Sequence, residues 1–256
     1  ADVTTVTAFL DLAVCPVSYD AVVFIEQAAM EARRQKADRL YVCVVGEPRV
    51  KPQYDAAEAA WRLWNIVLPA ANLFGARVML AADWLQAERI ASVKDWKNWP
   101  ADWREQTLSN RRHLIGGVVR RHREGEEIVR PRASEHARRK VSALFLGRRV
   151  VTMTARATSY LDARNTAARE WDAARQAIMD CGFYVRTIRD VDRALSIGEG
   201  FEELSLDLRM AMYELADFNI VANCGPASML WFSERPYVMC DAGVVEEEWK
   251  GLFVDQ

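Results

Sequence analysis

The sequence predicts an α/β protein built from two Rossmann-like halves, each a parallel sheet covered by helices. Three observations support this fold class. Short β-branched apolar runs alternate with amphipathic helical patterns, which is typical of doubly wound sheets. The alternation runs twice, with a helical connection between the two runs. The 256 residues, 51% of them hydrophobic and 27% charged, suffice for two small cores.

The first half opens with an apolar, β-branched run that predicts a strand at Thr4–Leu12. A helix follows to about Lys36, because Ser18 offers an N-cap and apolar residues then recur at helical spacing. The same reasoning predicts, in order, a strand Leu40–Val45, a helix Asp55–Phe74 closed by Gly75, a strand Arg77–Ala82, an irregular segment 84–103, a helix around Gln106–Glu124 and a short strand Glu127–Arg130.

The second half repeats the pattern after a helix that Ser134 begins and that ends near Leu146. Its further predicted elements are a strand Arg149–Thr154, a helix Thr166–Cys181, a strand Phe183–Ile188, a helix Leu206–Ala216, a strand Phe218–Ala222, a helix to Phe232 and a strand Pro236–Cys240. The domain boundary is expected near 134–148, which gives domains 1–140 and 141–256.

Charge is unevenly distributed over a total of −2. Residues 1–145 carry 22 Lys and Arg against 18 Asp and Glu, whereas residues 146–256 carry 12 against 18, and eleven of those twelve cations are Arg. The near-neutral total argues against a dedicated nucleic-acid binder, and the composition excludes disordered, collagen-like and disulfide-scaffold proteins.

The cysteines and the apolar segments predict a cytoplasmic protein. Five cysteines, an odd number without clustered spacing, indicate free thiols in a reducing compartment. No Cys/His set has zinc spacing, so no metal is expected. The N-terminus shows no signal-peptide pattern, and polar residues interrupt the most apolar stretch, Leu63–Ala82.

The strongest candidate ligand site is the turn Asn223-Cys224-Gly225-Pro226 with Ala227 and Ser228. Gly225 permits close backbone approach, and Pro226 suits the first position of a helix. Free N–H groups of Ala227 and Ser228 would then form an anion pocket with the helix dipole. The alternative is an ordinary turn, since a Gly-Pro sequence commonly opens a helix.

A second candidate is the loop after the strand that ends at Thr154. Arg156 leaves the carboxyl end of that strand, and Arg164-Asn165 closes the loop. Arginine presents a fork of donors that matches phosphate geometry, so two arginines at one mouth would attract a diphosphate. The structural alternative is a pair of salt bridges to Asp162 or Asp190.

Three acids are weaker candidates. Asp190 could bind a ribose hydroxyl or start a turn, and Glu214 could reach a ribose or lie on a solvated helix face. Asp11 ends the first strand and could act as a general base or hold an acceptor hydroxyl.

Two further segments have alternative readings. Segment 111–149 holds twelve Lys and Arg against four acids, which suits contact with RNA, an anionic membrane surface or an acidic partner. It lacks interleaved aromatic residues, so a solvated helix face is the favoured interpretation. The four tryptophans of 84–103 could form a sugar-stacking platform or an ordinary satellite core, and the core is favoured.

Several of these stretches resemble GT-B glycosyltransferases, namely uncharacterised bacterial surface-carbohydrate members. The similar stretches are Val150–Arg156 with Arg164-Asn165 and Trp171, then Leu208–Leu215 and Asn223–Pro226, and in the first half Phe9–Leu12 with Pro16–Asp20. The most specific part covers residues 150–226. The resemblance implies that Arg156, Arg164 and the Gly225-Pro226 turn hold the pyrophosphate of a nucleotide sugar without a metal.

The resulting hypothesis is a metal-independent glycosyltransferase of bacterial surface-polysaccharide synthesis. The nucleotide sugar would bind the C-terminal half, where Arg156 would stabilise the leaving group, and a glycan or lipid-linked acceptor would bind the N-terminal half near Asp11. The chain is short for this class and shows no E-x7-E signature. Two alternatives therefore stay open: a sugar-nucleotide epimerase or hydrolase, and a degenerate binding or assembly protein that self-associates as a homo-oligomer.

Overall fold

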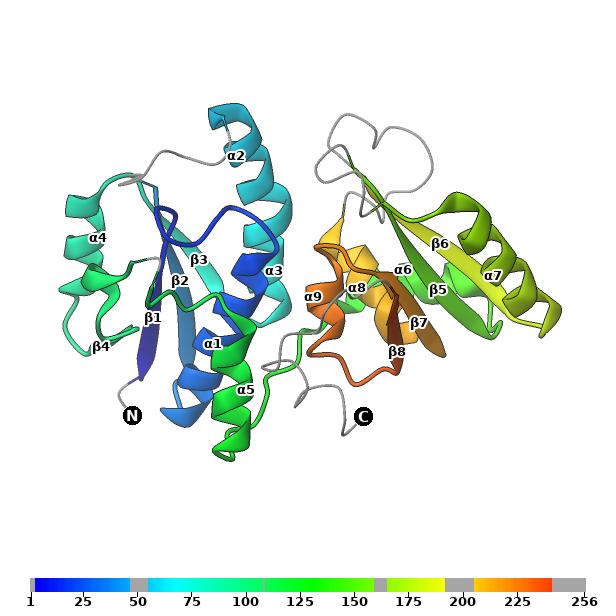
Figure 1. The fold of residues 1–256 in the computed structure, drawn as a ribbon. Helices are drawn as coiled ribbons and strands as arrows, with labels where there is room; N and C mark the ends of the chain where they lie inside the picture. The colour runs from blue at the N-terminus through cyan, green and yellow to red at the C-terminus, as the bar shows by residue number, and fades with distance from the viewer. Residues whose placement is uncertain (1–2, 47–54, 108, 159–164, 192–204, 241–256) are drawn as a thin grey trace. The chain divides into compact units, whose positions relative to one another are not determined.

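The computed structural model describes residues 3–46, 55–107, 109–158, 165–191 and 205–240. The chain forms two compact units, Ala1–Arg130 and Pro131–Gln256, and each contains one four-stranded parallel sheet flanked by helices (Figure 1). The predicted fold class, two Rossmann-like α/β halves, is confirmed. The expected boundary after residue 140 falls inside helix α6, Glu135–Phe145, which belongs to the second unit.

The first sheet has the strand order β3-β2-β1-β4, with every neighbouring pair parallel. Its strands are β1 Thr5–Asp11, β2 Arg39–Val45, β3 Arg77–Ala81 and β4 Trp96–Trp99. All seven residues of β1 are buried, as expected for a central parallel strand covered on both faces. Strand β4 was not predicted, because its four residues include Lys97 and Asn98 and show no apolar run.

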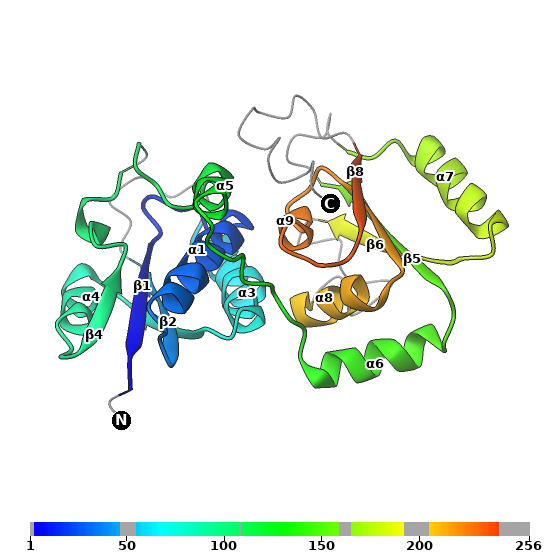
Figure 2. The same ribbon diagram turned by 90° about the horizontal axis from the view of Figure 1, so that it is seen from below.

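Helices cover both faces of this sheet. Helix α1, Asp20–Arg34, lies on one face and packs against α3, Leu68–Leu73, and α5, Ile115–Arg123. Helix α4, Trp84–Ala91, lies on the other face against β2 and β3 (Figure 2). The predicted helix Asp55–Phe74 is confirmed as a run of α2 Ala56–Arg62, the π-helical segment η1 Leu63–Val67, and α3. Pro69, which has no N–H to donate to the turn before it, lies two residues after the end of the widened segment.

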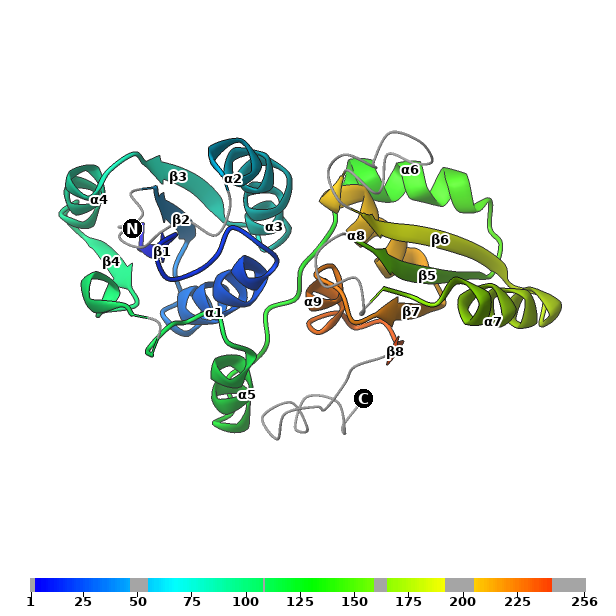
Figure 3. The ribbon, with the colours of Figure 1, turned by 45° about the horizontal axis from the view of Figure 1, so that its top comes forward.

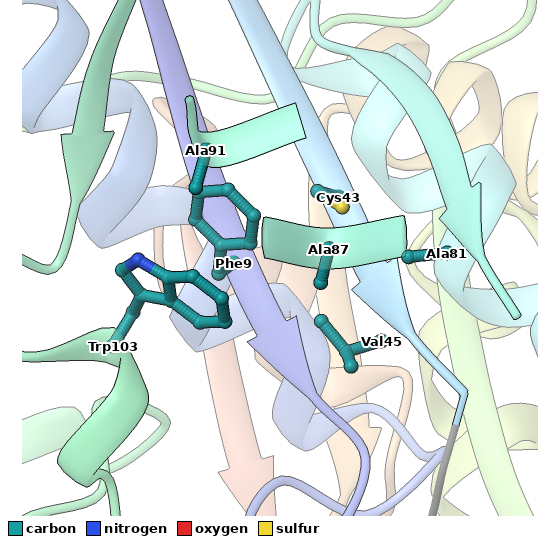
Figure 4. Packing of buried hydrophobic residues seen from close by; sticks show 7 residues of the cluster. All are labelled: Phe9, Cys43, Val45, Ala81, Ala87, Ala91 and Trp103. Carbon is teal, nitrogen blue, oxygen red and sulfur yellow. The ribbon is translucent and has the colours of Figure 1, made fainter. Parts of the chain in front are cut away.

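The tryptophan-rich segment is core rather than an exposed platform. Trp103, in the short 3-10 helix η2 Trp103–Glu105, is wholly buried and stacks on Phe9 with ring centroids 4.1 Å apart. Figure 4 shows these two rings beside side chains from β2, β3 and α4. Trp84 packs on the same indole at 4.8 Å, and Trp96 stacks on Tyr41 at 5.2 Å. The favoured interpretation, a satellite core, agrees with this packing.

The chain between η2 and the end of the first unit differs from the prediction. Helix α5 begins only at Ile115, because the Asn110 side chain accepts a hydrogen bond from the Thr107 N–H (2.6 Å), an alternative to helical bonding. Residues 127–130 form no strand. The Val129 N–H donates instead to Glu26 Oε1 of α1 at 2.7 Å.

The second sheet has the order β6-β5-β7-β8, again parallel throughout (Figure 3). Its strands are β5 Val150–Ala157, β6 Tyr184–Val191, β7 Phe218–Ala222 and β8 Tyr237–Cys240. Helix α7, Ala168–Asp180, packs on one face, and helix α8, Leu206–Leu215, packs on the other, with α6 against α8 (Figure 2). Helix α9 is a single turn, Ala227–Leu230.

The basic segment 111–149 belongs to both units, and many of its cations have acidic partners. Arg121 pairs with Glu31 at 3.2 Å, Arg112 pairs with Asp102 at 2.9 Å, and Arg138 lies 3.6 Å from Glu214. The segment is therefore part of the packing of both units, and membrane contact through it remains a prediction.

Candidate functional site

The second sheet reverses its strand order at β5. The chain passes from β5 to β6 on one side and then returns to β7 and β8 on the other side. The carboxyl ends of β5 and β7 are therefore adjacent, and the chain that leaves each of them turns to the opposite side. Open α/β sheets bind ligands at such a position. We call this edge, with the neighbouring end of β6 and the described residues that follow β5 and β7, the β5/β7 edge.

Arg156 is the penultimate residue of β5 and lies at this edge. It is 7% exposed, and its Cα lies opposite Asp190 of β6. The backbone on both sides is fixed: the Arg156 N–H donates to Thr166 Oγ1 at 2.8 Å, and its carbonyl accepts from the Thr166 N–H at 3.0 Å. Strand register thus makes Arg156 a neighbour of Asp190, one of the two acids that the structural alternative named as salt-bridge partners.

A second buried arginine, Arg209 of α8, was not among the predicted site residues. It is 2% exposed, and its guanidinium donates to the carbonyl oxygen of Arg189, next to Asp190, at 3.2 Å. A signal for it exists in the sequence. Leu206, Arg209, Met210 and Tyr213 share the spacing of one helical face, so Arg209 stands as a cation within an otherwise apolar stripe.

The buried thiol of Cys224, in the turn after β7, is influenced by the charged groups of this edge. Burial and the Asp190 carboxylate raise the pKa of Cys224, while Arg209, the hydrogen bond with the Ala227 backbone, and Arg156 act in the opposite direction. Two arginines, one aspartate and the loop after β7 are therefore within electrostatic reach of the same sulfur. Because the net effect is a raised pKa, the thiol stays protonated and is no nucleophile at neutral pH.

The prediction that the N–H groups of Ala227 and Ser228 are free to bind an anion is wrong. The Ala227 N–H donates to the Cys224 carbonyl and the Ser228 N–H to the Gly225 carbonyl, both at 3.1 Å. The Ser228 hydroxyl donates to the Gly225 carbonyl as well, at 2.9 Å. The turn through Pro226 winds tightly enough to use these donors itself, and α9 has only four residues. Asn223, half-buried, directly follows β7.

Asn165, which was predicted to close the loop after β5, stabilises that loop by hydrogen bonds to its backbone. Its side-chain oxygen accepts from the Thr158 N–H at 2.9 Å, and its amide group donates to the Thr158 carbonyl at 2.8 Å. Both polar ends of Asn165 are thus engaged in the loop that follows β5. Arg164, its predicted companion, lies outside the described residues.

Glu214 lies near the end of α8, close to where β7 begins, and so at the other end of that strand from the β5/β7 edge. Its carboxylate accepts from the Ala133 N–H at 3.0 Å and lies near Arg138. Burial raises the pKa of Glu214, opposed by the Ala133 hydrogen bond and by Arg138. The carboxyl group joins α8 to the start of α6 and is not brought together with Arg156.

Asp11 lies in the first unit, at the end of β1. Its side chain is buried and accepts from the Ala13 N–H at 2.8 Å, and its carbonyl accepts from the N–H groups of Val14 and Cys15. Asp11 therefore closes the turn after β1, a structural role that the sequence interpretation as a base did not include.

Within the described ranges, no three His, Cys, Asp or Glu side chains form a group that could hold a metal ion. None of the helices in those ranges combines the length and apolar character needed to cross a membrane. Comparison with known proteins gives no match to a family model, to a curated protein or to a solved structure.

Proposed function

We propose that this protein is a metal-independent glycosyltransferase that moves a sugar from a nucleotide sugar to a glycan acceptor, with the nucleotide diphosphate bound at the β5/β7 edge. The observation that carries the proposal is the pair of buried arginines, Arg156 and Arg209, at a switch point of a parallel sheet. The resemblance of residues 150–226 to GT-B glycosyltransferases supports the choice of donor.

Buried arginines suit a leaving diphosphate for two physical reasons. The guanidinium keeps its charge when it is partly desolvated, and it presents parallel N–H donors to phosphate oxygens. A charge held at low dielectric also acts more strongly on an incoming anion than it would in water. Arg156 and Arg209 would therefore stabilise the charge that develops on the diphosphate as the glycosidic bond to it breaks.

The remaining groups at the edge would position the nucleoside. Asp190, opposite Arg156 on the neighbouring strand, would accept hydrogen bonds from ribose hydroxyls. Loss of one arginine contact should cost about 3 kcal/mol of transition-state stabilisation, the size found for preorganised donors in other enzymes.

Thermal shift with a panel of nucleotides tests the donor site. UDP, GDP, CMP and their sugar conjugates would be added to the wild-type protein, to Arg156→Ala and Arg209→Lys, and to Arg175→Ala as a control. Arg175 is partly exposed in the middle of α7, so Arg175→Ala removes the same charge away from the edge. A nucleotide at 100 times its Kd should add about 2.7 kcal/mol to the free energy of unfolding.

The expected result is a shift in wild type and in Arg175→Ala that is lost in both edge variants. The absence of a shift with every nucleotide would contradict the donor site. A shift that both edge variants keep would place the nucleotide elsewhere in the chain.

A second candidate is a nucleotide-binding protein that transfers no sugar. The observation that favours it is the engagement of Asp11, the predicted base, in the turn after β1. Incubation of the protein with the nucleotide sugar that gives the largest shift, with and without a glycan mixture, separates the candidates. Transfer requires a new glycoside; free sugar or an epimer without acceptor indicates a hydrolase or epimerase; unchanged nucleotide sugar indicates binding alone.

A further inference from the structure

The two buried arginines of the β5/β7 edge come from different elements. Arg156 lies on β5, and Arg209 lies on α8. Two phosphate groups joined by an oxygen have a fixed separation, so they bind best to two guanidinium groups whose separation is also fixed. The distance between a strand and a helix stays constant only if the helix can neither slide nor rotate on the sheet.

A buried hydrogen bond joins α8 to β5 next to the two arginines. Thr154 Oγ1 lies 2.9 Å from the Tyr213 hydroxyl, and both side chains are wholly buried. Thr154 and Arg156 are two residues apart on β5, so their side chains point to the same face of the sheet, the face on which α8 packs (Figure 2). Tyr213 and Arg209 are four residues apart on α8, so they lie one turn apart on the same side of that helix.

The direction of α8 puts Arg209 on the edge side of this hydrogen bond. Because α8 ends close to where β7 begins, Arg209 lies nearer to the β5/β7 edge than Tyr213 does. The Arg209 guanidinium donates to the Arg189 carbonyl of β6 at 3.2 Å, and Arg189 is the register partner of Ala155, the residue before Arg156. The two arginines therefore belong to the same level of the sheet, one step beyond the pair of hydroxyl groups.

The Tyr213 hydroxyl adds position rather than volume to the core. Valine and phenylalanine would fill nearly the same space as Thr154 and Tyr213 without burying two hydroxyl groups, and a buried hydrogen bond of this kind adds only modestly to stability. Its geometry is narrow, however, because the two oxygens must stay within hydrogen-bond distance. Asn219 Nδ2 of β7 donates to the Tyr213 carbonyl at 3.3 Å, so the backbone of Tyr213 is held to the sheet as well.

We infer that the hydrogen bond between Thr154 and Tyr213 fixes the spacing of Arg209 and Arg156, and that this spacing makes the β5/β7 edge selective for two linked phosphate groups over one. Thr154 and Tyr213 are then positioning residues that act through the arginines. The inference rests on the proposed function for the location of the anion site. It narrows the donor to a sugar that is linked through a diphosphate rather than through a single phosphate.

Calorimetric titration of the whole chain with inorganic pyrophosphate and, separately, with inorganic phosphate tests this inference. Tyr213→Phe and Thr154→Val break the same hydrogen bond from its two sides, whereas Thr154→Ser keeps the hydroxyl group. Thr152→Val is the matched control. Thr152 is wholly buried on the same strand and face, one step farther from the edge, and its hydroxyl donates to Asn219 Oδ1 at 2.5 Å.

Tyr213→Phe and Thr154→Val should each weaken pyrophosphate binding about fivefold and phosphate binding much less. The double variant should bind pyrophosphate no more weakly than either single variant, and Thr154→Ser should bind it as the wild type does. Thr152→Val should lower the free energy of unfolding in urea by a similar amount to Thr154→Val but leave pyrophosphate affinity unchanged. That difference separates positioning from a general loss of stability.

Three results would overturn the inference. The wild type could bind pyrophosphate no more tightly than phosphate, Tyr213→Phe and Thr154→Val could bind pyrophosphate as tightly as the wild type, or Thr152→Val could weaken that binding equally.

The two proposals fail separately. If nucleotides stabilise the chain through Arg156 while Tyr213→Phe leaves pyrophosphate affinity unchanged, the donor site stands and this inference is wrong. If pyrophosphate binding follows the expected pattern while no nucleotide stabilises the chain, the positioned arginine pair stands and the transferase proposal is wrong.

Discussion

The two units share a parallel four-stranded sheet but differ in the charges that they bury. Among the described residues, the first unit buries the acids Asp11, Glu26 and Glu31 with His113, whereas the second buries two arginines, Arg156 and Arg209, and one acid, Glu214. The overall charges run the other way, since residues 1–130 carry 18 Lys and Arg against 17 Asp and Glu, and residues 131–256 carry 16 against 19. Most charged residues are exposed. The net charge of a unit therefore does not indicate whether its sheet edge binds an anion or a cation.

The units also differ in how deeply their helices pack. Helix α1 of the first unit buries twelve residues, whereas α7 of the second buries none completely. In the second unit the buried helical face belongs to α8, which buries seven residues and is tied to the start of α6 by the hydrogen bonds of Ala133 with Glu214 and of Ser134 with Asp207. Substitutions at apolar and at polar contacts therefore test different parts of the two units.

The largest effect is expected for Trp103→Ala in the first unit. The indole is wholly buried, stacks on Phe9 and contacts Trp84, so its removal leaves a cavity that the sheet cannot fill. The cost should be about 3–5 kcal/mol in the free energy of unfolding, measured by urea denaturation. Trp64→Ala, which removes an indole that is 61% exposed, serves as the control and should cost far less. If Trp64→Ala lost as much stability as Trp103→Ala, the distinction between core and surface indoles would be contradicted.

Buried strands were the easiest elements to predict. Strands β1 and β5 are covered on both faces, so their residues form apolar, β-branched runs that can be read without knowledge of their neighbours. Strand β4 was missed because it is short and contains the polar Asn98. The side-chain amide of Asn98 donates to the Ala91 carbonyl at 2.8 Å, a contact that only the fold creates.

The candidate site was harder to predict because its polar groups depend on tertiary partners. The position of Arg156 after a strand could be predicted, but the importance of Arg209 depends on α8 carrying it to the Arg189 carbonyl. The amides of Ala227 and Ser228 looked free in the sequence, and only the winding of the turn shows that they are used. Local sequence patterns thus predict the element on which a side chain lies, whereas its hydrogen-bond partners are determined by the tertiary fold.

Gly117→Ala should produce the next largest effect, again in the first unit. A Cβ at Gly117 would lie 2.6 Å from Gln27 Oε1 and 2.8 Å from its Nε2. The Gln27 side chain cannot move aside without losing its hydrogen bonds to the Arg112 and Leu114 carbonyls. The expected cost is about 1–3 kcal/mol.

A double-mutant cycle identifies the cause of that cost. Gln27→Ala removes the side chain that the new methyl group would strike, so the cost of Gly117→Ala should shrink when Gln27→Ala is already present. Additive effects of the two substitutions would show that the glycine is required for another reason.

Ser134→Ala tests the polar contacts of the second unit, with a smaller expected effect. The Ser134 hydroxyl accepts from the Ala137 N–H at 3.1 Å and donates to Asp207 Oδ2 at 2.6 Å, which caps α6 and ties it to α8. Its loss should cost about 1 kcal/mol in urea unfolding. Ser142→Ala, at an exposed position of the same helix, is the matched control and should be nearly neutral. Equal effects of the two would mean that the cap contributes nothing specific.

Glu26→Gln should change stability least in acid and progressively more as pH rises. Burial raises the pKa of Glu26, against the opposing effects of the Val129 hydrogen bond and of Arg121, Arg130 and Arg33. The folded protein therefore keeps this proton to a higher pH than the unfolded chain does. Stability is full below the unfolded pKa and falls as pH rises toward the folded value.

The glutamine of the Glu26→Gln variant does not titrate, so the free energy of unfolding of the variant should lack the decline with pH that Glu26 causes in the wild type. The two proteins should agree closely at low pH, where Glu26 is neutral, and diverge in favour of the variant toward neutral pH. Urea unfolding over a pH series measures the divergence, with Glu127→Gln as control because the Glu127 side chain is 71% exposed and pairs with Arg33. Parallel curves for wild type and Glu26→Gln would show that the buried carboxylate is fully compensated by its arginines. The first unit would then hold its buried negative charge without cost, and the contrast between the two units would be one of ligand preference alone.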